Sequence, residues 1–188
     1  MNRYELEHII RAASGIIDSD ELIIVGSQAI LGQFPEAPAS LTISREADVY
    51  PKDNPEASDV IDGAIGELST FHDTYGYYAH GVGEETAVLP RGWKERLIPI
   101  RNENTRGATG WCLEVHDLAA SKVVAGREKD VDFVTNMIIH RLADRDVLKS
   151  RINEIEFSDD ASKEMAVARL GRILKAVDAS QPGGSGQL

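Results

Sequence analysis

The chain has 188 residues, of which 42% are hydrophobic, and it carries a net charge of −11. Such an acidic surface repels phosphate backbones at long range, which excludes bulk nucleic-acid binding and argues against DNA as a partner. The single cysteine, Cys112, excludes an internal disulfide, and its neighbours Trp111 and Leu113 predict a buried structural thiol.

The N-terminal half predicts helices and strands in alternation. Apolar residues recur at helical spacing over residues 4–17, which favours an amphipathic helix. Residues 21–25 form a short apolar run typical of a buried strand, and a helix is expected to begin at Ser27. Residues 32–40 contain two prolines and predict a loop. Residues 41–50 are expected to be a hairpin-like or extended region that ends at Pro51.

The next segment predicts a helix over residues 56–68, with its core face formed by Val60, Ile61, Ala64, Ile65 and Leu68. Residues 76–115 are interpreted as strands between Gly- and Pro-rich turns, with candidates at 86–89, 96–100 and 111–115. Four helices are then expected, at 118–125, 131–142, 146–155 and 161–177.

The order of these elements predicts an α/β fold. A mixed-sheet core is expected over residues 1–116, followed by a helical C-terminal section over 117–179 and a disordered tail over 180–188. No apolar stretch approaches the about 18 residues of a membrane span, and the N-terminus lacks an apolar signal core. We therefore expect a cytoplasmic protein with no membrane partner.

Two carboxylates stand at strand spacing in the extended segment. Glu46 and Asp48 would share one face of a strand, with Ala47 and Val49 turned toward the core. Carboxylates placed side by side repel each other unless a cation lies between them, and Mg²⁺ (or Mn²⁺) favours carboxylate oxygens together with substrate phosphates. The alternative interpretation is a pair of exposed acids on an edge strand.

Gly26 and Ser27 follow the buried strand directly. A glycine permits close backbone approach, and a serine at the start of a helix lies near its positive end, so the pair could contact nucleotide phosphates. A plain strand-to-helix turn with Ser27 as the N-cap is equally compatible with the local sequence.

These motifs in this order resemble the minimal nucleotidyltransferase (polymerase-β-like) superfamily, which shows a hydrophobic residue, Gly, Gly or Ser, and later an acid–hydrophobic–acid triplet. A second block over residues 116–130, with Lys122 and Asp130, resembles an element of AbiEii-type toxins and of DUF6036-type proteins. The sequence departs from the superfamily at Glu46, where Asp is commoner.

The resemblance implies transfer of an NMP from an NTP to RNA, with tRNA as one candidate, or to a protein. It also implies a metal held by Glu46 and Asp48, and a toxin role with a neighbouring antitoxin as partner. The rival hypothesis is a non-catalytic nucleotide- or partner-binding protein that keeps the fold.

Further site residues follow from the same resemblance and from the local sequence. Lys122 is expected to contact the triphosphate or the active site, although a lysine on an apolar helix can also reach water. Asp130 could be a third acid, orient Lys122 or cap a helix, and Glu114 is a rival third carboxylate. The five histidines show no metal-ligand spacing.

An anionic substrate could dock on the segment over residues 89–106. This segment contains five basic and two acidic residues, a local charge of +3. A solvated charged loop is the alternative. Trp93 could stack on a base or anchor a turn. The candidate substrate-binding residues are Arg91, Trp93, Lys94, Arg96, Arg127 and Lys129.

Overall fold

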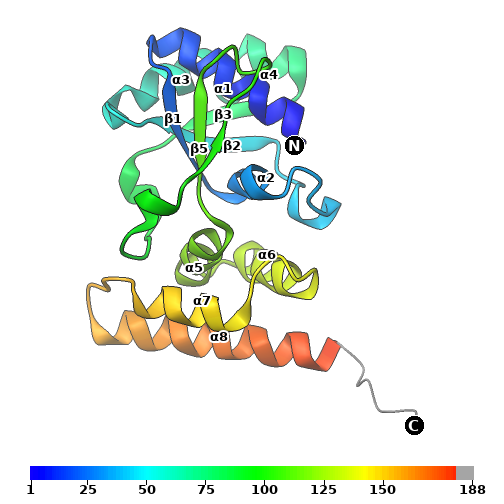
Figure 1. The fold of residues 1–188 in the computed structure, drawn as a ribbon, viewed down its shortest axis with the longest axis vertical. Helices are drawn as coiled ribbons and strands as arrows, with labels where there is room; N and C mark the ends of the chain where they lie inside the picture. Colours follow the sequence, from blue (N-terminus) through cyan, green and yellow to red (C-terminus); the bar gives the residue numbers. More distant parts are fainter. Residues whose placement is uncertain (181–188) are drawn as a thin grey trace.

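A computed structural model describes residues 1–180 of the chain. At its centre is a five-stranded sheet in the order β3-β2-β1-β5-β4 (Figure 1). The strands are β1 (Glu21–Val25), β2 (Glu46–Pro51), β3 (Tyr78–Gly81), β4 (Ile98–Ile100) and β5 (Thr109–Cys112). β1 runs antiparallel to β2 and parallel to β5, and β3 runs parallel to β2, so the predicted α/β fold with a mixed sheet is confirmed.

One face of the sheet is covered by the N-terminal helices α1 (Arg3–Ile17), α2 (Ile30–Gln33) and α3 (Ser58–Ile65). Helix α1 starts at a capping box formed by Asn2 and Glu5, and it buries its apolar stripe. It approaches the sheet closely, because a Cβ added to Gly110 of β5 would lie 2.4 Å from Cδ1 of Ile10. The opposite face of the sheet is therefore where a site can open.

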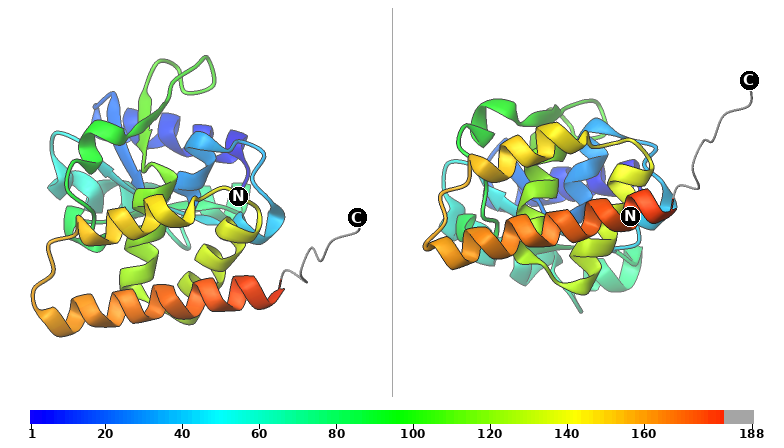
Figure 2. Two further views of the ribbon diagram at one scale, coloured as in Figure 1. Left: turned by 60° about the horizontal axis from the view of Figure 1, so that its bottom comes forward. Right: turned by 90° about the horizontal axis from the view of Figure 1, so that it is seen from below.

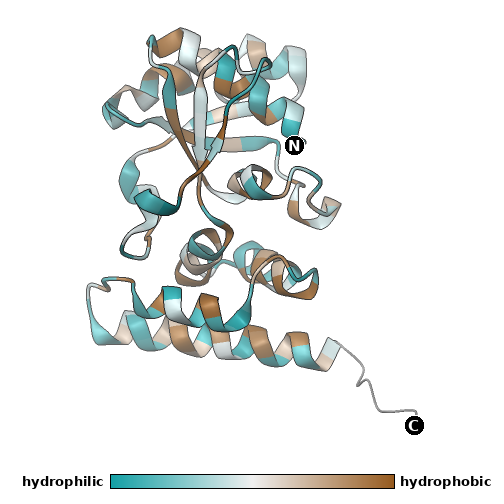
Figure 3. Ribbon diagram, viewed as in Figure 1, coloured by the Kyte–Doolittle hydropathy of each residue, from teal (hydrophilic) through white to brown (hydrophobic). Residues whose placement is uncertain are grey.

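The C-terminal helices α5 (Val115–Ala125), α6 (Glu128–Ile139), α7 (Arg145–Asn153) and α8 (Asp160–Ser180) pack on one another beside the sheet (Figure 2). Figure 3 shows hydrophobic and hydrophilic bands alternating along α8, which buries Ala166, Leu170, Ile173 and Val177. Within the described part of the chain, no helix has the length and apolar character of a membrane span.

The boundaries of this helical section differ slightly from those expected. Helix α5 begins at Val115, before the expected start at 118, because the side chain of Glu114 caps it. Ser180, the first residue of the expected tail, is the last residue of α8, and the rest of that tail lies outside the described residues. The division into two domains near residue 116 stays a prediction.

Two expectations for the middle of the chain are wrong. Residues 86–89 are not a strand: Glu84–Thr86 form a 3-10 turn, Val88 is exposed, and the missing strand is β3. The helix expected over 56–68 is a 3-10 turn at Pro55–Ala57 followed by α3, which ends before Gly66.

The core face predicted for that helix is also partly wrong. Ile61 and Ile65 are buried, whereas Val60 is 55% exposed and Leu68 is 83% exposed. Leu68 lies beyond the helix end, in the connection to α4 (Thr70–Tyr75).

Cys112 is fully buried at the end of β5, as the sequence predicts. It packs against α2 so closely that a Cβ on Gly32 would lie 2.5 Å from Cβ of Cys112. Burial raises the pKa of the Cys112 thiol to about 12, so it stays protonated and unreactive.

Candidate active site

The acid pair lies on the open face of β2. Ala47 and Val49 are fully buried beneath it, while the side chains of Glu46 and Asp48 are 37% and 20% exposed. This is the arrangement that strict alternation along a strand produces. Both carboxylates therefore point to the same side, as the sequence predicts.

His80 joins this pair from β3. The parallel register places Asp48 beside His80 and Glu46 beside Tyr78. The Nδ1 atom of His80 lies 3.0 Å from Oδ1 of Asp48 and 3.9 Å from Oε1 of Glu46. Each of the three residues Glu46, Asp48 and His80 offers one ligand atom, and these atoms lie within 4.8 Å of one another.

Sequence reasoning missed His80 because it missed β3. The five histidines show no metal-ligand spacing in the sequence, but a ligand on a neighbouring strand needs no such spacing along the chain. The sequence did contain a signal, the short alternation Tyr78-Ala79-His80. In the structure Ala79 is buried and its two neighbours are not.

The electrostatics of the pair indicate a site short of positive charge. Burial and then the neighbouring Glu46 raise the pKa of Asp48, and the hydrogen bond with His80 only partly opposes this. Two carboxylates placed this close together repel each other, and a cation between them relieves that repulsion. The Tyr78 hydroxyl donates to Oε2 of Glu46 at 3.0 Å, which leaves Oε1 on the side of His80.

Gly26 closes the site at the end of β1. Its backbone lies at φ 66° and ψ −170°, a conformation that L side chains avoid. A Cβ added here would lie 2.0 Å from Oδ2 of Asp48. Ser27 follows as the first residue of a 3-10 turn, Ser27–Ala29, which leads into α2. Gly26 and Asp48 are thus in direct contact, and the donor set of the Gly-Ser turn and the acid pair fits a divalent metal and phosphate.

A second charged cluster is built by α5 and α6. Nζ of Lys122 lies 3.0 Å from Oδ1 of Asp130, and Nε of Arg127 lies 2.6 Å from Oδ2 of the same carboxylate. Asp130 is buried, and burial alone would raise its pKa, but hydrogen bonds from Arg127 and Lys122 outweigh this and leave the pKa lowered. Asp130 is therefore an ionised partner of both cations.

Arg127 belongs to this second cluster and also feels the charges of the acid pair. Its hydrogen bond with Asp130 raises its pKa, and the charges of Asp48 and Glu46 contribute in the same direction. The side chain is 61% exposed, so the guanidinium remains accessible to a ligand. Lys129, two residues further along the chain, is also exposed.

The two candidates for a third carboxylate are engaged elsewhere. Asp130 accepts from Lys122 and Arg127, an arrangement that fits orientation of Lys122. Glu114 caps α5, and its Oε1 lies 2.7 Å from Nδ1 of His116. Among the described residues, neither belongs to the group formed by Glu46, Asp48 and His80.

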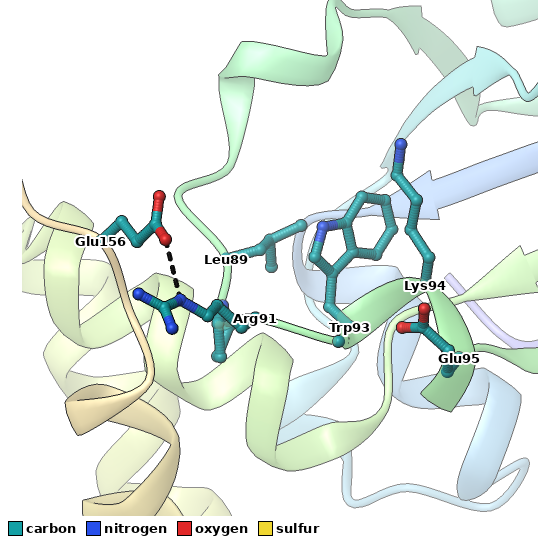
Figure 4. Close-up of a pocket in the computed structure, with 8 residues that line it drawn as sticks. Leu89, Arg91, Trp93, Lys94, Glu95 and Glu156 are labelled. Atoms are coloured by element: carbon teal, nitrogen blue, oxygen red, sulfur yellow. Dashed lines mark hydrogen bonds and ion pairs between the residues drawn. The ribbon is translucent and has the colours of Figure 1, made fainter.

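The basic segment expected to dock a substrate lines a pocket of about 340 Å³ (Figure 4). Arg91 reaches across to Glu156 at 2.8 Å, and Lys94 lies over the ring of Trp93, 5.3 Å from its centroid. A second pocket of about 150 Å³ shares Trp93 and Lys94 and reaches Tyr50 of β2, two residues from Asp48.

Arg96 has a different environment from its neighbours in that segment. Its guanidinium makes two hydrogen bonds, of 2.8 and 2.9 Å, with the fully buried Asp117 of α5. Arg151 of α7 lies 3.1 Å from the same carboxylate. Arg96 thus ties the basic segment to the C-terminal helices.

A mixed sheet with a Gly-Ser turn after one strand, set against an acid pair on the antiparallel neighbour, defines the nucleotidyltransferase class. A family model described as "Nucleotidyltransferase of unknown function (DUF6036)" matches residues 4–175, and the chain belongs to this family. No curated protein matches the chain, and no solved structure does.

Proposed function

We propose that the protein transfers an NMP from an NTP to an acceptor hydroxyl, with a divalent metal, Mg²⁺ or Mn²⁺, held by Glu46 and Asp48. The observation that carries the proposal is the contact between Gly26 and Asp48, because it joins the phosphate-binding turn to the metal-binding acid. When bound, the metal supplies Lewis-acid stabilisation of the phosphoryl oxygens.

The residues of the chain have distinct roles in this proposal. The backbone and hydroxyl groups at Gly26 and Ser27 contact the β- and γ-phosphates, because glycine permits close approach there. Lys122 holds the triphosphate, with Asp130 fixing its direction. Arg127, whose pKa is raised first by Asp130 and also by the charges of Asp48 and Glu46, adds positive charge for the leaving pyrophosphate.

The reaction breaks a phosphoanhydride bond of the NTP and forms a phosphoester bond to the acceptor. The acceptor oxygen forms a bond to the α-phosphorus, the bond from that phosphorus to the β-phosphate bridge breaks, and pyrophosphate leaves. The hydroxyl proton passes to water. Positioning the hydroxyl in line with the leaving group is then the main task of the protein.

The acceptor is proposed to be RNA, with tRNA as one candidate, or a protein. The pocket lined by Arg91, Trp93 and Lys94 supports an acceptor with flat rings and phosphates, because an aromatic ring beside cations suits stacked bases. Lys129 is exposed beside Arg127 and extends the basic surface on the side of α6.

Incubation of the protein with each α-labelled NTP, total RNA or lysate protein, and Mg²⁺ or Mn²⁺ tests the proposal. Label should move to one acceptor class with release of pyrophosphate. Asp48→Asn should abolish the transfer, whereas Asp53→Asn, an exposed acid just beyond β2, should leave it unchanged. Nucleotide binding without any release of pyrophosphate would favour the non-catalytic alternative.

The resemblance to AbiEii-type toxins leads to a proposed toxin role with an antitoxin partner. Induced expression of the wild-type chain should then arrest growth, and expression of Asp48→Asn should not. Equal growth of the two strains, with transfer demonstrated in vitro, would reject the toxin role and keep the enzyme.

A further inference from the structure

We propose that His80 is a third ligand of the metal held by Glu46 and Asp48, and that it makes the site prefer Mn²⁺ to Mg²⁺. This inference rests on the proposed function, because it concerns the metal of the same site. It starts from the distances between Nδ1 of His80 and the two carboxylates, 3.0 Å to Asp48 and 3.9 Å to Glu46.

The backbone fixes His80 in this position. Residues 46–49 of β2 pair with residues 78–81 of β3 in parallel register, so His80 shares the open face with both acids. β3 is held against α3, because a Cβ on Gly81 would lie 2.0 Å from the carbonyl oxygen of Ser58. The side chain of His80 is 49% exposed and is free to meet an incoming ion.

Each of the three side chains keeps one ligand atom available on the shared side. For Glu46, Oε2 accepts from Tyr78, which leaves Oε1 on the side of His80. For Asp48, Oδ2 lies against Gly26, and Oδ1 is the atom 3.0 Å from Nδ1 of His80. A metal would replace this hydrogen bond and draw on three side chains already brought together.

The donor set determines which metal is favoured. Mg²⁺ takes oxygen ligands in strict octahedral geometry and gives up water reluctantly. Imidazole suits transition metals better, and carboxylates accept Mn²⁺ readily. Two carboxylates and one imidazole therefore suit Mn²⁺. A third carboxylate would favour Mg²⁺ over Mn²⁺. The two candidates are paired with other residues, Asp130 with Lys122 and Glu114 with His116.

Direct metal binding without nucleotide tests the inference. Calorimetric titration should show tighter binding of Mn²⁺ than of Mg²⁺ to the wild-type protein. His80→Ala should weaken Mn²⁺ about tenfold or more and Mg²⁺ much less, a loss in the range known for altered metal environments. His80→Asp should give the site three carboxylates and shift its preference from Mn²⁺ to Mg²⁺. His140→Ala removes an exposed histidine at the end of α6 and is the matched control.

A spectroscopic measurement tests the ligand role of His80 independently of the binding affinity. Electron spin-echo spectra of Mn²⁺ bound to the wild-type protein should show coupling to a ¹⁴N nucleus, and this coupling should vanish in His80→Ala. Unchanged Mn²⁺ affinity in His80→Ala, or absence of nitrogen coupling in the wild type, would overturn the inference. The proposed function would still stand if Asp48→Asn alone removed metal binding and transfer.

Discussion

Oδ2 of Asp48 lies against the backbone of Gly26, so close that a methyl group added to Gly26 would come within 2.0 Å of it. Gly26 also holds a positive φ of 66°. The turn after β1 and the acid on β2 therefore behave as one unit, and a change in the turn displaces the acid.

Gly26→Ala should both destabilise the protein and inactivate the site. The strained backbone should cost about 1–3 kcal/mol of unfolding free energy. Displacement of Asp48 should lower transfer by about 10²-fold, the effect of misplacing a reacting group by about 1 Å. Urea denaturation and the labelled-NTP assay measure the two effects.

Gly63→Ala is the matched control for this substitution. Gly63 lies within α3 with nothing within 4 Å of an added Cβ, so alanine should stabilise the protein by up to about 1 kcal/mol. Wild-type transfer by Gly26→Ala would contradict the contact as the basis of the site.

Lys122→Met should weaken NTP binding and lower stability together. The buried Asp130 would lose one of its two cations, at a cost of about 2 kcal/mol. Fluorescence titration with an NTP and thermal unfolding measure the effects, and Lys163→Met, an exposed lysine on α8, should change neither. Reduced stability with unchanged NTP affinity would make Lys122 purely structural.

Asp130→Asn should produce a stability loss that depends on pH. The folded-state pKa of Asp130 is lowered: burial raises it, but Arg127 and Lys122 outweigh burial. The charged carboxylate therefore stabilises the fold above the unfolded pKa, and this contribution is lost as pH falls through the folded pKa. The difference in unfolding free energy between variant and wild type should be about 2 kcal/mol at neutral pH.

Urea denaturation across the acid range measures this gap, which should shrink below about pH 4, where an ordinary aspartate begins to bind a proton. Asp59→Asn, an exposed acid in the first turn of α3, should show little difference at any pH. A gap for Asp130→Asn that stays constant to about pH 3 would show that the charge of Asp130 contributes nothing.

Arg96→Met and Arg91→Met should differ sharply, although the two arginines belong to the same basic segment. Arg96 pairs with the fully buried Asp117, so its loss should cost about 2 kcal/mol of unfolding free energy. Arg91 pairs with Glu156 at the surface, where both side chains are about three-quarters exposed, and such pairs contribute about 0–1 kcal/mol. Equal losses in denaturation would contradict the structural role given to Arg96.

The sequence predicted the parts of the fold that carry strong periodic patterns. The buried run of β1 and the alternation Glu46-Ala47-Asp48-Val49 were sufficient to place both strands and the common face of the acids. Lys122 and Asp130 were named from a resemblance, and their ion pair could not be read from spacing because it joins two helices.

The parts that the sequence could not predict depend on tertiary context. β3 has four residues, including Ala79 and Gly81, and it is a strand because β2 supplies its hydrogen-bonding partner. The Gly- and Pro-rich turns around residues 86–89 suggested a strand, but this segment is not part of the sheet. His80 could be recognised as part of the site only once β3 was placed.

The position of Cys112 makes the protein suited to labelling experiments. Because the only thiol of the sequence is fully buried against α2 and has a pKa of about 12, maleimide and nitroxide reagents should leave it unmodified in the folded state. A single cysteine introduced at exposed Lys129 would then be the sole labelled position. A reporter there, two residues from Arg127, could follow nucleotide binding without first replacing Cys112.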